Sequence, residues 1–262
     1  MGLFDEGQGA FIEDHSRQGN NATAINFDDT TSWQPSPFGK SLTFAGSVDQ
    51  YVNIPKHFWR DNPQEYAISF WMSLSSNVAA TRCAFTYTNT GGSPHSFMQF
   101  TVHTLRMTMS CSDGSTTPSV LTTAGYFAVN RYYHIVGVRD AANIHLYVDG
   151  VLIGSTAHTL GTITVTATPK IGISPTLNTQ DWLGTINDFR AFRRVLSPYE
   201  VKELFEQPYE MFNRQYAPIF AFGTTAAGGL VKNRNGLGIA SLSKLNGLAM
   251  ASVKNINGLT NI

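Results

Sequence analysis

The chain has 262 residues, of which 14% are charged, and its 18 basic and 18 acidic residues give a formal net charge of zero. This length fits one large all-β domain or one medium domain with an appendage. The balanced charge disfavours a nucleic-acid partner, because phosphate binding usually leaves a basic stripe on the protein.

Neither end of the chain nor its cysteines indicate export or metal binding. The N-terminal stretch MGLFDEGQGAFIED is acidic and lacks the apolar core of a secretory signal, and no apolar run is long enough to span a bilayer. We therefore expect no secretion signal, no membrane insertion and folding in the cytoplasm where the chain is made. Cys83 and Cys111 form no C-x-x-C pair, which favours buried thiols over a disulfide framework or a zinc site.

Strands dominate the first two thirds of the chain. Alternation of apolar and polar residues between turn residues predicts strands at Ser41–Phe44, Tyr51–Ile54, Ala67–Leu74, Phe97–Val102, Leu105–Met109, Tyr132–Val138, Ile144–Val148, Thr162–Thr166 and Trp182–Phe192. The pair Asp149-Gly150, between IHLYV and VLIG, predicts a tight hairpin, since both central positions of a type I′ turn need positive φ. Many short strands at this spacing predict a β-sandwich.

One helix follows the last of these strands. Ser197 can cap it, Pro198 suits its first position and Glu200 completes an S-x-x-E capping box, while Val201, Leu204 and Phe205 share one face. We expect this helix to end near Gln207-Pro208, which closes a first domain at residues 1–207. Residues 208–230 lose clear periodicity and end in TTAAGG, so they are predicted to be a linker.

Residues 231–262 form a tail with an eleven-residue repeat. The repeated unit is Asn-Gly-Leu, at Asn235, Gly236, Leu237, Asn246, Gly247, Leu248, Asn257, Gly258 and Leu259. Each Asn-Gly predicts a tight turn, and each flanking segment is too short to bury its own apolar residues. We therefore predict that the tail serves oligomerisation or attachment to a partner surface; the alternative is a disordered tail.

Five ordered blocks carry a family resemblance. These are the stretch from Leu3 to Thr23, GKSLTFAGSVDQYVNIP, AISFWMSL, YYHIVGVRDAANIHLYVDGVLIGS and LGTINDFRAFRRVLSPYEVKELFE. Over about residues 3–206 the chain resembles the laminin-G-like members of the concanavalin A-like lectin/glucanase superfamily. The resemblance implies an all-β fold: an antiparallel, jelly-roll-like sandwich with a short C-terminal helix, here followed by a β-rich repetitive tail.

The resemblance also implies a structural calcium ion, held by an N-terminal Asp/Asn loop and an acidic pair near the end of the domain. The matching residues are Asp14, Asn21, Asn187 and Asp188, with Asn187 in place of the usual aspartate. An amide oxygen is a weaker ligand than a carboxylate for this hard cation. The alternative is that Asp14 and Asn21 form only turn hydrogen bonds while Asp188 pairs with Arg190 or Arg193.

Ligand-binding and catalytic residues are not specified by the sequence. Aromatic residues that could stack on sugar rings are Trp59, Trp71, Tyr87, Tyr126 and Tyr132, although a strand aromatic is more often part of the core, as we expect for Trp71. The E-x-D-x-E carboxylate run of retaining glucanases is missing, as are other common catalytic motifs. We therefore expect no enzymatic activity and assign no catalytic residue.

The tail repeat resembles short repetitive tails of bacteriophage and prophage structural proteins that carry laminin-G-like domains. The leading hypothesis is a non-enzymatic phage virion protein that decorates the capsid or belongs to a head fibre or the tail. Its expected partners are other virion proteins, further copies of the chain, with a trimer as one arrangement, and a surface glycan. A cellular carbohydrate-binding or adhesion module is the alternative, and a glycosidase is the third class.

Overall fold

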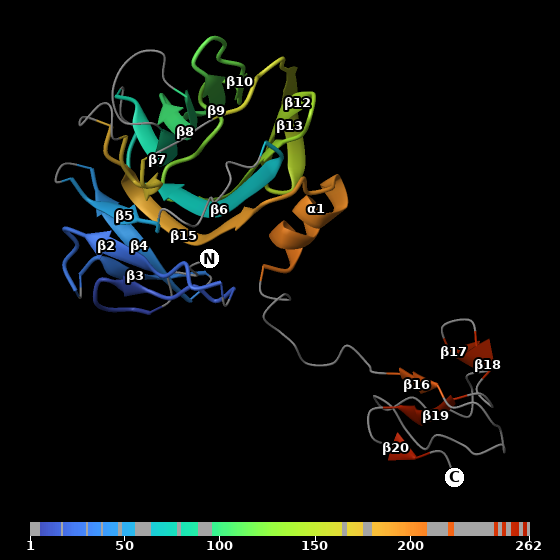
Figure 1. Cartoon of the computed structure of the whole chain (residues 1–262). Helices are drawn as coiled ribbons and strands as arrows, with labels where there is room; N and C mark the ends of the chain where they lie inside the picture. Colours follow the sequence, from blue (N-terminus) through green and yellow to red (C-terminus); the bar gives the residue numbers. More distant parts are fainter. Residues whose placement is uncertain are drawn as a thin grey trace. The chain divides into compact units, whose positions relative to one another are not determined.

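The computed structural model describes residues 6–16, 18–29, 31–37, 39–46, 49–55, 64–77, 80–88, 96–163, 167–174 and 180–208, together with five short strands beyond residue 219. The chain divides into two compact units, Met1–Pro208 and Tyr209–Ile262. Figure 1 labels the helix and strands of each unit.

The first unit is a sandwich of two antiparallel sheets. The eight-stranded sheet has the order β1-β2-β5-β14-β7-β8-β9-β10, with β1 (Phe11–Ile12), β2 (Ala22–Ile25), β5 (Tyr51–Asn53), β14 (Lys170–Ile171), β7 (Arg82–Thr88), β8 (Ser96–His103), β9 (Arg106–Asp113) and β10 (Ser119–Leu121). The seven-stranded sheet has the order β13-β12-β11-β6-β15-β4-β3, with β13 (Val151–Ala157), β12 (Asn143–Val148), β11 (Tyr132–Arg139), β6 (Tyr66–Leu74), β15 (Leu183–Phe192), β4 (Gly39–Ala45) and β3 (Trp33–Ser36).

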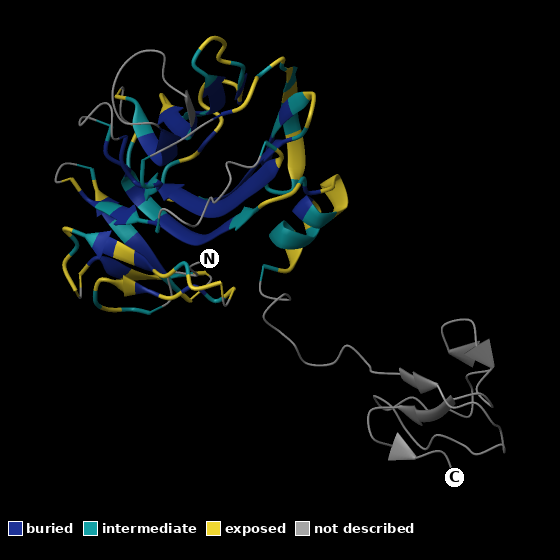
Figure 2. Cartoon of the chain, viewed as in Figure 1, coloured by how far each residue is buried: buried dark blue, intermediate teal, exposed yellow. Residues whose placement is uncertain are grey.

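The core lies between the two sheets, where alternate residues of each strand meet. All nine residues of β6 are buried, and Figure 2 shows the centre of the seven-stranded sheet as the most buried part of the unit. Phe70 of β6 packs edge-on against Phe100 of β8, with ring centroids 5.4 Å apart. Burial of aromatic and aliphatic side chains on both inner faces is the main force that holds the sheets together.

The outer face of the seven-stranded sheet is covered by the helix α1 (Pro198–Glu206). Ser197 caps α1: its side chain accepts from the Glu200 amide, and the Glu200 side chain bonds back to the Ser197 amide, so the predicted capping box is confirmed. Val201 is fully buried in a cluster with Ala67 and Val136 of the sheet. Phe205 stacks on Trp71 at 5.7 Å, which fixes the helix over β6.

Most predicted elements are confirmed within two residues, apart from the C-terminal end of β9, which lies four residues beyond the predicted strand. Asp149 and Gly150 have φ of 49° and 76° and join β12 to β13 with Val148 paired to Val151, as a type I′ turn requires. The strand predicted at Thr162–Thr166 is wrong at its start, because residues 162 and 163 lie in no strand; residues 164–166 lie outside the described residues.

The second unit contains short antiparallel pairs. β17 (Lys244–Leu245) pairs with β18 (Leu248–Ala249), and β19 (Val253–Ile256) pairs with both β20 (Leu259–Thr260) and β16 (Phe220–Phe222). β16 falls inside the segment that the sequence analysis assigned to a linker, so that segment contains a strand. Its partner β19 lies more than thirty residues away, and local periodicity does not reveal such pairing.

Two further predictions concern the cysteines and the membrane. Cys83 and Cys111 are free and fully buried, as predicted. Among the described residues, no helix combines the length and the hydropathy needed to cross a bilayer.

Candidate functional site

A groove of about 700 Å³ opens at one end of the sandwich, where β11 turns into β12. It is lined by Gln64, Glu65, Arg139, Asp140, Ala141, His158, Leu160, Gly161 and Thr162. The lining therefore comes from three places in the chain: the entry to β6, the β11–β12 turn and the segment after β13. A volume of this size is in the range of ordinary small-ligand sites.

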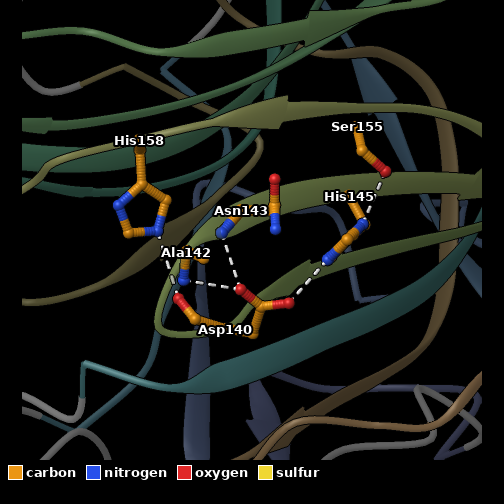
Figure 3. A network of polar contacts seen from close by, with 6 residues as sticks. All are labelled: Asp140, Ala142, Asn143, His145, Ser155 and His158. Carbon is orange, nitrogen blue, oxygen red and sulfur yellow. Dashed lines mark hydrogen bonds and ion pairs between the residues drawn. The ribbon is translucent and has the colours of Figure 1, made fainter.

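Asp140 organises the turn beside this groove (Figure 3). Its Oδ1 accepts from the amides of Ala142 at 2.7 Å and Asn143 at 2.6 Å, and its Oδ2 lies 2.8 Å from Nε2 of His145. Burial by itself raises the pKa of the Asp140 carboxyl, but the hydrogen bonds from His145, Ala142 and Asn143 outweigh it, so the pKa lies below its ordinary value. Asp140 is therefore ionised at neutral pH.

The negative charge of Asp140 determines which groups of the network donate hydrogen bonds. An ionised carboxylate can only accept, so Nε2 of His145 donates to Asp140, while Nδ1 forms a hydrogen bond with the Ser155 hydroxyl, 2.6 Å away. This is the hydroxyl–imidazole–carboxylate order of a hydrolytic triad. However, His145 and Ser155 are direct cross-strand partners on β12 and β13, and Ser155 sits within a strand rather than on a strained turn. We interpret the network as one that fixes the turn and its two strands.

A second histidine, His158, holds another part of the groove lining in place. In Figure 3 Asp140 lies between His145 and His158. Nε2 of His158 lies 3.1 Å from the Asp140 carbonyl oxygen, and its Nδ1 accepts from the Leu160 amide at 3.2 Å. Both ring nitrogens are thus used, and the neutral ring ties residues 158–160 to the β11–β12 turn. Hydrogen bonds therefore fix several residues that line the groove. A ligand that binds there loses less free energy to ordering the protein.

Of the predicted metal ligands, Asp14 and Asn21 lie together. Oδ1 of Asn21 accepts from the Asp14 amide at 2.8 Å. The Asp14 carboxylate is buried and accepts from the amides of Ser16 and Asn20, and from their side chains. These are the turn hydrogen bonds of the alternative interpretation.

The second predicted pair lies on β15 and has partners of its own. Asp188 and Arg190 form a buried bidentate ion pair, with Nε to Oδ1 at 2.7 Å and Nη2 to Oδ2 at 2.6 Å. Asn187 donates through Nδ2 to Ser36 at 3.0 Å. Both carboxylates already accept hydrogen bonds from protein donors, as the alternative interpretation expects. Among the described residues, no group of three or more His, Cys, Asp or Glu side chains could hold a metal. Calcium binding stays a prediction.

The aromatic candidates are mostly core residues. Trp71 and Tyr87 are buried, with 5% and 3% exposure, so stacking on a sugar is excluded for them in this structure. Tyr126 is 38% exposed and Tyr132 is half-buried, and Trp59 lies outside the described residues. None of the four that the structure describes lines the groove.

The repeat residues fall in the second unit. Leu248 begins β18 and Leu259 begins β20, opposite Leu245 and Ile256 respectively. Asn235, Gly236, Leu237, Asn246, Gly247, Asn257 and Gly258 lie outside the described residues.

The residues of the groove were not predicted from the sequence, and Asp140 was not singled out. The available indication was the stretch Arg139-Asp140-Ala141-Ala142-Asn143, where an aspartate precedes a turn and can accept from amides two and three residues on. The approach of Gln64 and His158 depends on tertiary folding and has no counterpart in local pattern.

Comparisons with known proteins agree with the fold. The family model described as "Concanavalin A-like lectin/glucanases superfamily", of the laminin-G type, matches residues 45–202. No curated protein matches the chain.

Three similar solved structures illustrate the fold. They are the binding domain of Paraclostridial Mosquitocidal Protein 1 (15% identity, TM-score 0.62, covering 79% of this chain and 53% of that chain), the botulinum neurotoxin serotype D binding domain (12%, 0.61, 79% and 52%) and the receptor binding domain of botulinum neurotoxin C/D mosaic serotype (14%, 0.59, 77% and 51%).

At these identities the structural likeness shows the fold alone, and the matched part spans about half the length of those chains. The family model, in contrast, matches more than half of this chain in sequence. The chain belongs to the concanavalin A-like lectin/glucanases superfamily.

Proposed function

We propose that this chain is a non-enzymatic structural protein of a bacteriophage virion, in which the lectin-type sandwich is the binding module and the tail is the assembly element. The family supports a binding module, and the three similar structures are named as binding or receptor-binding domains. The expected positions are the capsid surface, a head fibre or the tail.

The observation that carries the virion assignment is the repeat after residue 230. Two of its three Asn-Gly pairs are flanked by strands that pair across them, Leu245 with Leu248 and Ile256 with Leu259. The β17–β18 pair has only two residues in each strand and is marginally stable at best alone in water, which favours support from neighbouring copies or a particle surface. The repeat also resembles the tails of phage structural proteins. Other virion proteins and further copies of this chain are therefore the proposed partners.

The groove beside Asp140 is the proposed contact surface for a glycan or another host-surface group. It combines exposed polar side chains with positions fixed by hydrogen bonds, as described above. Lectin-type sites bind through a few fixed polar groups, so neither a metal nor a catalytic step is required.

Deletion of residues 231–262 tests the tail. We expect the truncated protein to lose its oligomeric state in sedimentation analysis and its association with particles, while tryptophan fluorescence of the sandwich is unchanged. A matched control replaces the tail by a Gly/Ser segment of equal length. A truncated protein that keeps the same oligomer and still decorates particles would contradict the proposal. Capsid, portal or tail genes beside the coding sequence would support it.

The second candidate is a cellular carbohydrate-binding or adhesion module, which the names of the similar structures favour. Here the tail deletion would leave glycan-array binding and cell-surface attachment intact, and no particle association would be found. Release of reducing sugars from a bound glycan would instead indicate a glycosidase.

A further inference from the structure

Arg139, at the end of β11, is a buried cation at the edge of the groove. Its side chain is 2% exposed and nevertheless contributes to the groove lining. Nη1 donates to Oε1 of Gln64 at 3.1 Å, and Nη2 donates to the Gly161 carbonyl at 3.4 Å. Both acceptors are neutral, so these bonds hold the guanidinium in place without cancelling its charge.

Neighbouring groups do not supply a counter-charge. Among the described residues Arg139 forms no ion pair; the Asp140 carboxylate faces His145 instead. On the inner side, the Tyr66 hydroxyl lies 2.9 Å from the Cys111 thiol. Burial raises the pKa of Cys111 to about 11 and that of Tyr66 well above its ordinary value, although Arg139 lowers both. Both groups are therefore neutral at pH 7.

A buried and unpaired charge is costly, and proteins normally avoid it or pair it. A guanidinium carries five N–H groups, and the two bonds described above use two of them. Nε is buried without a partner. The Arg139 guanidinium is thus held in place and still has N–H groups without a partner. Planar guanidinium groups of this kind bind carboxylates and phosphates.

We propose that the groove binds a carboxylate-bearing ligand with hydroxyl groups, whose carboxylate reaches the Arg139 guanidinium. A monoanion is favoured over a phosphate dianion because Glu65 and Asp140 also line the groove and repel a second negative charge. Glu65 is exposed at the rim, where its negative charge acts on a bound anion. The inference rests on the proposed binding role of the groove and names its ligand class.

Glucuronate and glucose are the matched probes, since they differ only in a carboxylate against a hydroxymethyl group. Binding is measured on the full chain by ligand-observed NMR at low salt, with immobilised oligosaccharides that end in either sugar as a second format. We expect glucuronate to bind and glucose to bind at least roughly tenfold more weakly, because hydrogen bonds to a charged group are worth about 1.5–3 kcal/mol. Raising the salt concentration should weaken glucuronate binding.

Three variants separate recognition from a merely structural role. Arg139→Gln removes the charge, and we expect a roughly ten- to hundredfold loss of glucuronate affinity. Glu65→Gln alters an exposed rim residue and should strengthen glucuronate binding roughly two- to fivefold by removing repulsion. Asp29→Asn removes one exposed charge outside the groove lining and should change nothing. Because Glu65 is exposed, its variant stays informative even where Arg139→Gln fails to fold.

The outcomes distinguish the two proposals. Equal binding of glucose and glucuronate, or unchanged affinity in both Arg139→Gln and Glu65→Gln, would overturn the carboxylate inference and leave a binding groove. Competition by inorganic phosphate as strong as that by glucuronate would overturn the monoanion preference. Failure of every probe on the full chain would overturn the groove's ligand class, whereas the particle-association experiment would still decide the virion role.

Discussion

Acid sensitivity of the sandwich should come in large part from His134 of β11. Its ring is 1% exposed, lies 5.0 Å from Trp71 and 6.2 Å from Phe205 of α1, and Nε2 is 2.8 Å from the Ser69 hydroxyl. Burial first, and then the nearby positive charge of Arg190, lower the pKa of His134 from 6.5 to about 3. The ring therefore stays neutral in the folded protein over most of the acidic range.

The direction of the pH effect on stability follows from which state of the protein binds the proton. Below pH 6.5 the unfolded chain protonates His134 and the folded protein does not, so acid favours unfolding until the pH nears 3. The contribution of His134 to stability is complete above pH 6.5 and is lost as the pH falls from 6.5 to 3. The slope grows towards about 1.4 kcal/mol per pH unit as the unfolded imidazole becomes fully protonated, so acidification from pH 6.5 to 4.5 should cost about 2 kcal/mol through this residue alone.

Urea unfolding of the wild type and of His134→Gln at several pH values between 4.5 and 7 measures this loss. All four tryptophans precede residue 208, so tryptophan fluorescence reports on the sandwich and not on the tail. The free energy of unfolding of His134→Gln should fall by about 2 kcal/mol less than that of the wild type between pH 6.5 and 4.5. The exposed His103, changed to Gln, should behave as the wild type does. Parallel pH profiles for the wild type and His134→Gln would refute the argument.

Four further changes test other parts of the structure. Ser197→Ala removes the helix cap and should lower the free energy of unfolding by about 1 kcal/mol in urea titrations, whereas the exposed Tyr199→Ala should be nearly neutral. Gly184→Ala places a Cβ 2.0 Å from the Ser73 carbonyl oxygen at a φ of 142° and should cost about 3 kcal/mol or more, against roughly 1 kcal/mol for Gly39→Ala, which meets no neighbour. Because burial raises the pKa of both thiols, iodoacetamide at pH 8 should leave Cys83 and Cys111 unmodified until urea unfolds the sandwich; labelling of the folded protein would contradict their burial. If the calcium site implied by the family resemblance forms, millimolar calcium should raise the thermal midpoint by several degrees and EDTA should reverse the rise, whereas an unchanged midpoint would favour the turn hydrogen bonds and the Asp188–Arg190 pair alone.

The sandwich could be predicted because its central strands carry strong local patterns. β6, β11, β12 and β15 alternate or run apolar over six to ten residues, and the Asp149-Gly150 turn follows from backbone sterics alone. The edge and connecting strands were missed for the opposite reason. β1 and β14 have two residues each, and β3 contains Pro35, which local patterns assign to a turn. Their pairing depends on neighbours far along the chain.

The candidate site was less predictable than the fold. Family resemblance directed attention to residues 14, 21, 187 and 188, whereas the groove is assembled from residues 64–65, 139–141 and 158–162. The feature that matters at Arg139 is that no described residue forms an ion pair with it, and the 18 acidic residues of the sequence give no indication of this. Burial of a charge and absence of an ion pair are properties of the packed structure.

The surroundings of Asp188 show how the asparagine at position 187 affects the predicted calcium site. Asp188 lies at a β-bulge of β15 with a φ of 49°, is buried, and would be costly without a counter-charge. In the family pattern that counter-charge comes from calcium, with an aspartate at position 187. Here Arg190, two residues on along the strand, donates to both Asp188 oxygens and also to the Pro208 carbonyl at the end of the unit. The Arg190 guanidinium thus neutralises the negative charge of Asp188, as a bound cation would. Because Asn187 is neutral, a divalent ion here would gain one carboxylate fewer than at a site with aspartate in both positions, so any calcium affinity should be lower.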